Sequence, residues 1–274
     1  MIGNVGGGSL YIGYRVRVVI NGQFTGGSLL VGGGTLALYG DNPNAVSADI
    51  WGGTLLVQGS QPSLNITMLR EMETFSCPFL SGDGVVGDVT AFTGLTRVTP
   101  DSTLSVTNFT ASSLIIRLNG TNVGEYGRLV ASGNVSLADG SLTPSPGFNP
   151  QPGQIFTIVE KTSPGPIANA IFGPEGKITT LNGMPFRISY VGGDGNDVTL
   201  TATPPRLDIA RTNPATVRLS WPTNYPGFNL QRASAIDGSA SWSNHPTSRV
   251  LMGSNYTVTQ PATTNQEFFR LKQP

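Results

Sequence analysis

The sequence repeats one short pattern, written as GGSLYIG at 7–13, GGSLLVG at 26–32, GGTLALYG at 33–40 and GGTLLVQG at 52–59. Each copy has two glycines, a hydroxyl residue, a short run with apolar residues two apart, and a closing glycine. Paired glycines favour a turn with positive φ, and apolar residues two apart give a strand one buried face. A strand this short cannot bury that face alone, so the copies are expected to stack on one another.

The copies start 19, 7 and 19 residues apart, at positions 7, 26, 33 and 52. A spacing near 19 is typical of one turn of a β-solenoid, and a spacing of 7 fits two successive strands within a turn. Two apolar residues from each copy are then predicted to face inward: Leu10 and Ile12, Leu29 and Val31, Leu36 and Leu38, and Leu55 and Val57.

The composition supports an all-β chain with few charges. Only 12% of the 274 residues are charged, and the 16 basic and 16 acidic residues balance. Such a chain lacks the positive charge that drives binding to nucleic acid or anionic lipid, and it has no apolar run of about 20 residues. The 36 glycines and 20 prolines lie among short apolar runs, which indicates many strands joined by turns.

The chain is predicted to contain two domains. Strand-like patterning runs through 1–203, where 66–73 is interpreted as a strand followed by a loop and 192–196 as a hairpin turn. The prolines of 203–205 mark a boundary. Residues 204–274 are predicted to form a small antiparallel β-sandwich of fibronectin or immunoglobulin type, with strands at 217–221, 228–231, 256–259 and 268–272.

Several phrases occur in an order that resembles a known family. They are LIIRLNG at 114–120, EYGRL at 125–129, GNVSL at 133–137, GQIFTIV at 153–159, FRISY at 186–190 and GGDGNDV at 192–198. Together with the glycine repeats they resemble the end of bacterial autotransporter-associated β-strand repeat proteins. The phrases LSWP at 219–222, FNLQ at 228–231 and FFRL at 268–271 resemble a short β-sandwich module that ends many large secreted proteins.

The resemblance implies a right-handed parallel β-helix over 1–203 and a secreted or cell-surface location. It implies adhesive or structural roles and supplies no catalytic residues. The first residues, MIGN, lack the pattern of a signal peptide, so if the protein is secreted we expect this chain to be either a fragment or a mature form that begins within the repeats. No membrane β-barrel pattern follows residue 201.

One loop is a calcium candidate. The stretch 192–198 is close to a calcium-binding nonapeptide, with Asp194 and Asp197 as its carboxylates. Repeats of that kind share each ion between consecutive turns, so a single copy supplies half a site. Thr199 also occupies the position where the pattern has an apolar residue. A plain hairpin without an ion, and without any other cofactor, is the favoured interpretation.

Aromatic residues in and beside the repeats are candidate sugar ligands. Tyr11, Tyr39 and Trp51 could present ring faces on which sugars stack, as could Tyr14. The alternative is that these rings cover the inner apolar residues or their edge. This alternative is the favoured one.

Catalytic patterns are weak. The stretch GDGVVG at 82–87 fits a phosphate-binding motif, but strand-like residues follow it where a helix is needed. His245 is the only histidine, and no G-x-S-x-G occurs, so a surface position in a loop is predicted for it. A glycosidase or lyase needs grouped carboxylates, whereas the candidates show no repeating offset: Asp83, Asp88, Asp101, Glu125 and Asp139.

Three functions follow in order of preference. The first is a non-enzymatic extracellular structural or adhesive segment, which could also associate end to end through open strand edges. The second is a carbohydrate-binding accessory module of a polysaccharide-degrading protein. The third is a β-helix polysaccharide lyase or hydrolase, which requires its carboxylates to lie on one face. The partners expected for the first two are polysaccharides or other cell-surface components.

Overall fold

The computed structural model shows an all-β chain that divides into two compact units. The first unit comprises Met1–Asn182 and Phe186–Ala202, and the second comprises Gly183–Pro185 and Thr203–Pro274. No helix occurs among the residues that the structure describes. These residues are 8–24, 26–42, 44, 46–69, 77–92, 96–111, 113–137, 141–146, 148, 150–168, 172–181, 184–223, 225, 227–237, 240–262 and 266–273.

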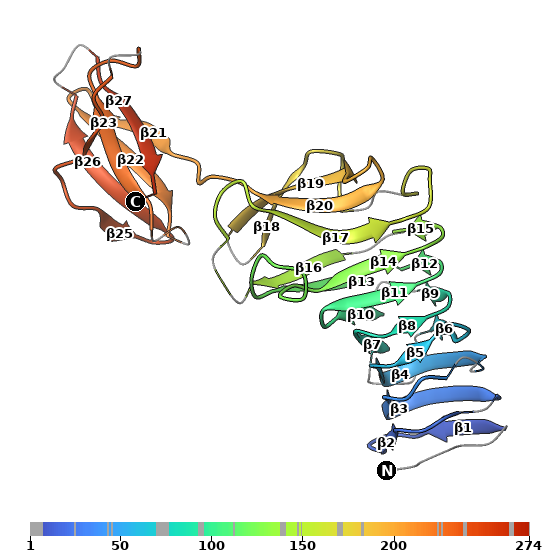
Figure 1. Ribbon diagram of the computed structural model, residues 1–274. Coiled ribbons are helices and arrows are strands. Elements are labelled where there is room, and N and C mark those ends of the chain that lie inside the picture. The colour runs from blue at the N-terminus through green and yellow to red at the C-terminus, as the bar shows by residue number, and fades with distance from the viewer. Residues whose placement is uncertain are drawn as a thin grey trace. The chain divides into compact units, whose positions relative to one another are not determined.

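Two sheets build the first unit (Figure 1). The larger sheet has 12 described strands: β1 (Ser9–Ile12), β2 (Arg17–Ile20), β3 (Ser28–Leu38), β4 (Ser47–Val57), β6 (Asn65–Met68), β7 (Phe79–Gly82), β9 (Val89–Ala91), β10 (Arg97–Pro100), β12 (Phe109–Thr110), β13 (Ser113–Leu118), β15 (Val135–Ser136) and β16 (Ser141–Pro146). The smaller sheet has eight: β5 (Ser60–Gln61), β8 (Val85–Val86), β11 (Thr103–Val106), β14 (Arg128–Ala131), β17 (Ile155–Lys161), β18 (Ile178–Leu181), β19 (Met184–Gly192) and β20 (Asp197–Ala202).

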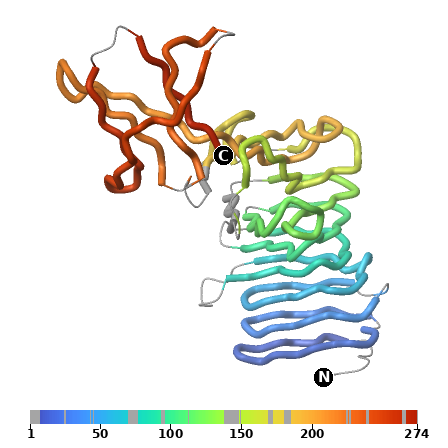
Figure 2. The backbone as a smooth tube through the Cα atoms, turned by 60° about the vertical axis from the view of Figure 1, so that its left-hand side comes forward, coloured from blue at the N-terminus to red at the C-terminus, as the bar shows by residue number. Residues whose placement is uncertain are grey.

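The strands of the first unit form three columns. In successive passes the chain runs through β6–β7–β8, then β9–β10–β11, then β12–β13–β14. Each strand pairs in parallel with its counterpart in the next pass: β6 with β9, β9 with β12, β7 with β10, β10 with β13, β8 with β11, and β11 with β14. Figure 2 follows these passes as a stack from blue to green. The result is a parallel curled sheet, and one pass is called a coil below.

Parallel pairing in register stacks apolar side chains on apolar side chains. In the first column each buried residue is the register partner of a buried residue one coil away: Leu29, Ala48, Ile66, Val89, Phe109 and Val135. Seven of the eight residues predicted to face inward are buried, and Leu10 is half-buried. The alternation of apolar residues therefore predicted the core face of these strands correctly.

The repeated glycines act differently from the prediction. Residues 28–32 of the second copy and 33–38 of the third form the single strand β3, and β4 contains Gly52 and Gly53 of the fourth copy. The register of β3 with β4 shifts between Val31 and Thr35 and then resumes. The flanking residues keep pairing with the same neighbouring strand, so these glycines bend a continuous strand. The predicted turn at these glycines is therefore a bend within one strand. The predicted two strand positions per coil are retained, because β1 and β2 pair with the two halves of β3, and β6 and β7 pair with the two halves of β4.

Close backbone approach explains why these positions are glycine. A Cβ atom on Gly53 would lie 2.2 Å from the carbonyl oxygen of Gly34, one coil away, and Gly53 has a φ of +72°. A Cβ atom on Gly82 would lie 1.8 Å from the carbonyl oxygen of Val57. Both distances are far shorter than any non-bonded contact of carbon, so a side chain cannot fit between the stacked coils.

The parallel pairing ends at β17. This strand pairs in parallel with β14 on one side and antiparallel with β20 on the other. The antiparallel hairpin of β19 and β20 then carries the loop predicted at 192–196, so the hairpin prediction is confirmed. The strand expected at the start of 66–73 is β6, and 70–76 lies outside the described residues.

The second unit contains two antiparallel sheets. Its four-stranded sheet has the order β21 (Asp208–Asn213), β22 (Thr216–Pro222), β26 (Asn255–Pro261) and β25 (Val250–Met252). Its three-stranded sheet has the order β24 (Ser243–Asn244), β23 (Asn229–Ala233) and β27 (Phe268–Lys272). Residues from both sheets share one buried cluster: Leu219, Trp221 and Val258 from the first and Leu230 from the second.

Candidate functional site

The two calcium candidates lie in different surroundings. Asp194 is exposed in the loop between β19 and β20, whereas Asp197 is buried at the start of β20. The Oδ1 atom of Asp197 accepts a hydrogen bond from the backbone N–H of Lys161 at 2.9 Å. Burial raises the pKa of the Asp197 carboxyl above its usual value, and the charges of Asp194 and Glu160 add to that effect. Among the described residues no group of three or more His, Cys, Asp or Glu side chains is placed to hold a metal ion.

Beside this loop, a lysine binds a set of convergent carbonyl groups. The Lys161 side chain is 2% exposed, and its Nζ donates to the carbonyl oxygens of Ser163, Pro164 and Gly165 at 2.8, 2.8 and 3.0 Å. The amide of Asn196 donates to the Ser163 oxygen at 2.7 Å. The carbonyl oxygens of this turn thus surround the chain's own ammonium group. Sequence reasoning missed Lys161, because a lysine at the end of a strand reads as a surface residue.

The candidate aromatic residues are spread over different columns. Tyr11 on β1 is 62% exposed, and Tyr39, which follows β3, is 41% exposed. Tyr11 pairs in register with Leu30, nine residues before Tyr39 on the chain, so the two tyrosines do not stack in one row. Trp51 within β4 is half-buried. Sequence reasoning missed Phe92, which follows β9 and is 64% exposed.

Asp88 belongs to a row of polar side chains at the corner before the first column. The row contains one residue per coil: Asn65, Asp88, Asn108 and Asn134. Each Oδ1 atom accepts the backbone N–H of the next member, at 2.9, 3.1 and 2.7 Å in turn. We call this set the amide row. It satisfies backbone donors at a corner where strand pairing is interrupted.

Two other candidate carboxylates come together at another corner. Asp83 directly follows β7, and Asp101 directly follows β10. The last residues of these two strands, Gly82 and Pro100, are register partners. The Asp101 carboxylate lies 3.4 Å from the guanidinium of Arg117 on the next coil. Asp83 is exposed. Of the four candidate carboxylates that the structure describes, only these two therefore share one corner.

The remaining candidate carboxylates lie elsewhere or outside the described residues. Glu125 accepts from the backbone N–H and the side-chain amide of Asn122, both at 3.0 Å, and these bonds lower the pKa of its carboxyl. It thus belongs to the turn that follows β13. Asp139 lies outside the described residues. The glycine motif at 82–87 runs from the end of β7 through β8, and strand β9 follows it, as the sequence predicted.

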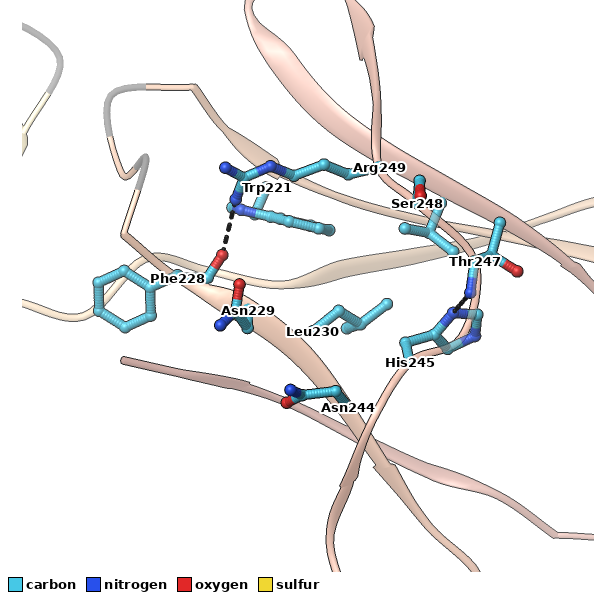
Figure 3. A pocket seen from close by; sticks show the side chains of 10 residues that line it. Trp221, Phe228, Asn229, Leu230, Asn244, His245, Thr247, Ser248 and Arg249 are labelled. Carbon is cyan, nitrogen blue, oxygen red and sulfur yellow. Dashed lines mark hydrogen bonds between the residues drawn. The ribbon is translucent and has the colours of Figure 1, made fainter. Parts of the chain in front are cut away.

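The second unit contains a pocket of about 390 Å³ (Figure 3). Its floor is apolar and buried, formed by Trp221, Leu230 and Val258. Its walls carry polar side chains from the three-stranded sheet and from the segment after β24: Asn229, Asn244, His245, Thr247, Ser248 and Arg249, with Phe228 at one end. The lining residues span 221–258, which is why sequence reasoning did not find the pocket.

One polar group of the pocket floor has no hydrogen-bond partner. The indole Nε1 of Trp221 is buried and bonds to no acceptor among the described residues. A buried donor left unpaired costs on the order of 1–3 kcal/mol, and native structures leave few of them. The Arg249 guanidinium lies nearby in the wall: it donates to the carbonyl oxygen of Phe228 at 2.8 Å and lies 4.1 Å above the ring of Tyr256.

His245 lies in a loop, directly after β24, as predicted, but it is only partly exposed and belongs to a polar network. Its Nδ1 accepts from the backbone N–H of Thr247 at 3.2 Å, so its Nε2 carries the proton and donates to Oε1 of Gln260 at 2.6 Å. Gln260 in turn donates to Glu267 at 2.8 Å, and Glu267 pairs with Arg232 at 3.2 Å. Each polar atom of the imidazole ring is engaged, which suits a structural role.

Comparison with known proteins assigns no family to the chain, so its proposed function rests on the geometry of its residues. In the part of the chain that the structure describes, no helix has the length and apolarity to cross a membrane. No protein-family model matches the chain, and a search of curated proteins finds no match either.

Proposed function

We propose that this chain is a non-enzymatic structural or adhesive segment of a secreted or cell-surface bacterial repeat protein. In this proposal the first unit is a right-handed parallel β-solenoid, and the second is a β-sandwich of fibronectin or immunoglobulin type. The observation that carries it is the amide row, in which one side chain per coil bonds to the backbone of the next. Side chains that repeat in this way build a scaffold, and crossovers between parallel strands are nearly always right-handed.

An activity screen tests the non-enzymatic part of the proposal. We expect the protein to release neither reducing ends nor unsaturated sugars from a panel of neutral and acidic polysaccharides. Turnover that disappears in Asp83→Asn or Asp101→Asn, and persists in the control Asp194→Asn, would contradict the proposal. Those two carboxylates are the appropriate targets because they share one corner of the coils.

A binding assay tests the adhesive part. Beads that carry the full chain are expected to adhere to bacterial or host cell surfaces more than beads that carry an unrelated protein of equal charge. Equal adhesion by both kinds of bead would leave only the structural role. An experimental structure in which the coils run left-handed would contradict the solenoid assignment.

A carbohydrate-binding accessory module is the second candidate. Its support is the exposure of the Tyr11 and Tyr39 rings, on which sugars could stack. A glycan array should then show binding that falls in Tyr11→Ala, Tyr39→Ala or Trp51→Ala. The matched control is Val123→Ala, which removes an equally exposed apolar side chain that has no ring. An array without signal would remove this candidate.

Self-association remains part of the proposal for the first unit. Among the described strands, β1 and β2 pair only with β3, so their outer edges have no partner there. Such an edge is a template for another strand. We expect the mass measured by light scattering to grow with protein concentration, and a monomer at every concentration in sedimentation would contradict this.

A further inference from the structure

The second unit is basic, although the chain as a whole has no net charge. It contains seven Lys and Arg residues against three Asp and Glu residues, whereas the first unit contains nine against thirteen. The formal charge of the second unit is therefore +4, and that of the first unit is −4. A net charge of one sign attracts partners of the opposite sign. The charge balance of the whole chain therefore does not exclude an anionic partner for the second unit.

Part of this positive charge is neutralised within the unit and part is not. Two ion pairs occur among its described residues: Arg206 with Asp208 at 2.8 Å, and Arg232 with Glu267 at 3.2 Å. Arg270 and Lys272 are both exposed, and neither forms an ion pair with any residue that the structure describes. Both belong to β27. One strand therefore carries two positive charges that no carboxylate compensates.

These two cations lie on the side of the three-stranded sheet that faces away from the core. Phe269 and Leu271 alternate with them on β27 and pack against the buried cluster. Successive side chains of a strand point to opposite faces, so Arg270 and Lys272 share the outer face. Register partners continue this face across β23 and β24 over roughly 10 Å. We call the set the basic face: Asn229, Gln231, Asn244, Arg270 and Lys272.

Contacts with neutral groups hold Arg270 in place. Its Nε donates to Oε1 of Gln231 at 2.9 Å, and the amide of Gln231 donates to Oδ1 of Asn244 at 3.2 Å. The guanidinium also lies 4.2 Å above the ring of Trp242. These contacts orient the planar fork without cancelling its charge, and they use only the Nε donor of its N–H groups. The fork is therefore prepared to bind a carboxylate at low entropic cost.

The amides beside the two cations match the hydroxyls of a sugar. Asn229 is the register partner of Lys272, and Asn244 is the neighbour of Gln231 on the other side. Both asparagines are exposed. An amide both donates and accepts hydrogen bonds, and a ring hydroxyl needs both kinds of partner. An acidic peptide would match the cations but would offer few hydroxyls to the amides. The combination of cations and amides therefore favours a carbohydrate that carries carboxylates.

We propose that the basic face of the second unit binds an acidic polysaccharide. Its carboxylates lie at Arg270 and Lys272, and the hydroxyls of its rings contact Asn229 and Asn244. This inference gives the adhesive role proposed above a partner of defined chemistry and rests on that role. It does not depend on the scaffold proposed for the first unit, because every residue of the basic face belongs to the second unit.

A titration of the full chain with a short galacturonate oligomer tests the proposal by nitrogen-15 NMR. The indole N–H signal of Trp242, identified as the one lost in Trp242→Phe, reports on the basic face because Arg270 lies over this ring. We expect that signal to shift in a saturable way and the affinity to fall as salt is added. The methyl-esterified oligomer has the same rings without the charge and should bind far more weakly.

Two double variants with the same loss of charge locate the site. Arg270→Gln with Lys272→Gln should weaken galacturonate binding roughly twenty-fold, because each cation near an anionic surface contributes roughly five-fold. The control is Arg211→Gln with Arg218→Gln, which removes two exposed arginines from the four-stranded sheet. It lowers the charge of the unit by the same amount and should change the affinity far less.

A polymer of glutamate separates sugar recognition from attraction to charge alone. It carries carboxylates but no hydroxyls, so we expect it to bind the full chain more weakly than a galacturonate oligomer of equal charge at the same salt concentration. Asn229→Ala should weaken galacturonate binding several-fold and leave the binding of polyglutamate unchanged, because only the sugar offers hydroxyls to this amide.

Three outcomes would overturn the inference. If the oligomer at saturating excess leaves the Trp242 signal unmoved, the basic face is not its site. If the Arg211 and Arg218 double variant weakens binding as much as the Arg270 and Lys272 double variant, only the net charge of the unit matters. If polyglutamate binds as tightly as galacturonate, the sugar is not recognised. In each case the adhesive and scaffold proposals stand or fall by their own tests, because cell adhesion and the handedness of the coils are measured separately.

Discussion

Asp88 accepts two hydrogen bonds from Asn108, its counterpart one coil further along: one from the backbone N–H at 3.1 Å and one from the side-chain amide at 2.9 Å. A carboxylate that the sequence marked as a catalytic candidate is therefore used to join two coils. The same corner holds Asn65 and Asn134, so the contact is one step of a row.

Replacing Asp88 by alanine is expected to lower the free energy of unfolding by about 1–3 kcal/mol, because the Asn108 donors lose their acceptor. Asp88→Asn keeps an Oδ1 acceptor and should cost less than about 1 kcal/mol. Urea unfolding followed by circular dichroism measures both. The control is Asp83→Ala, an exposed carboxylate on the other side of β8; an equal loss there would contradict the role of the amide row.

Gly53→Ala is expected to be strongly destabilising, because its Cβ atom would meet the Gly34 carbonyl oxygen at 2.2 Å. Gly176→Ala is the matched control: Gly176 has a φ of +76°, close to the +72° of Gly53, and open space around its Cβ position. Both variants carry the conformational cost of a positive φ. The free energy of unfolding should fall by about 2 kcal/mol or more further in Gly53→Ala than in Gly176→Ala. This difference measures the effect of the close approach alone.

Lys161→Met should cost about 3 kcal/mol of stability, because three carbonyl oxygens lose a charged donor inside the protein. Lys177→Met, at an exposed lysine of the same unit, is the control. Thermal unfolding compares the two. If both variants melt at the same temperature, the Lys161 ammonium contributes no stability.

Asp197→Asn should change how stability depends on pH. Burial raises the pKa of Asp197, so folding favours the protonated carboxyl. Its stabilising contribution is complete below the usual carboxyl pKa and is lost as pH rises through the raised value. The variant keeps the acceptor for Lys161, and urea unfolding across the acidic range should show that this pH-dependent loss has disappeared. An unchanged profile would contradict the assignment.

The buried phenols should be visible at alkaline pH. Burial raises the pKa of Tyr225 and of Tyr190 to about 12. Both phenols therefore stabilise the fold fully below pH 10, and this stability is lost as pH rises through about 12. Ultraviolet titration should show a tyrosinate component near that midpoint, and Tyr225→Phe should remove part of its amplitude. No loss of amplitude would show that Tyr225 titrates elsewhere.

Some features were predictable because they depend on neighbours in the chain. The alternation in 28–38 identified the buried face of β3, the alternation in 54–57 identified that of the second half of β4, and the glycine-rich loop at 192–196 identified a hairpin. The glycine positions were recognised but their role was not. Whether a glycine turns the chain or bends a strand depends on how close the next coil approaches, and no local pattern contains that distance.

In the candidate sites, too, residues could be noticed in the sequence while their contacts could not be predicted from it. His245 was noticed as the only histidine, but its bonds to Gln260 and Thr247 come from residues whose proximity depends on the fold. No sequence pattern marked Lys161 as a buried residue, because the carbonyl groups that bind its ammonium group are oriented only once the turn forms.

The sequence by itself determined that the chain is all-β, which residues of the repeats are buried, and where the patterning changes near residue 203. These properties follow from backbone preference and from the period of apolar residues, which neighbouring residues fix. Only the tertiary structure decided that Asp88 bonds to Asn108, that Asp83 and Asp101 share a corner, and that Trp221 and Arg249 line one pocket. Register between strands sets each of these contacts, and register is a property of the folded chain as a whole.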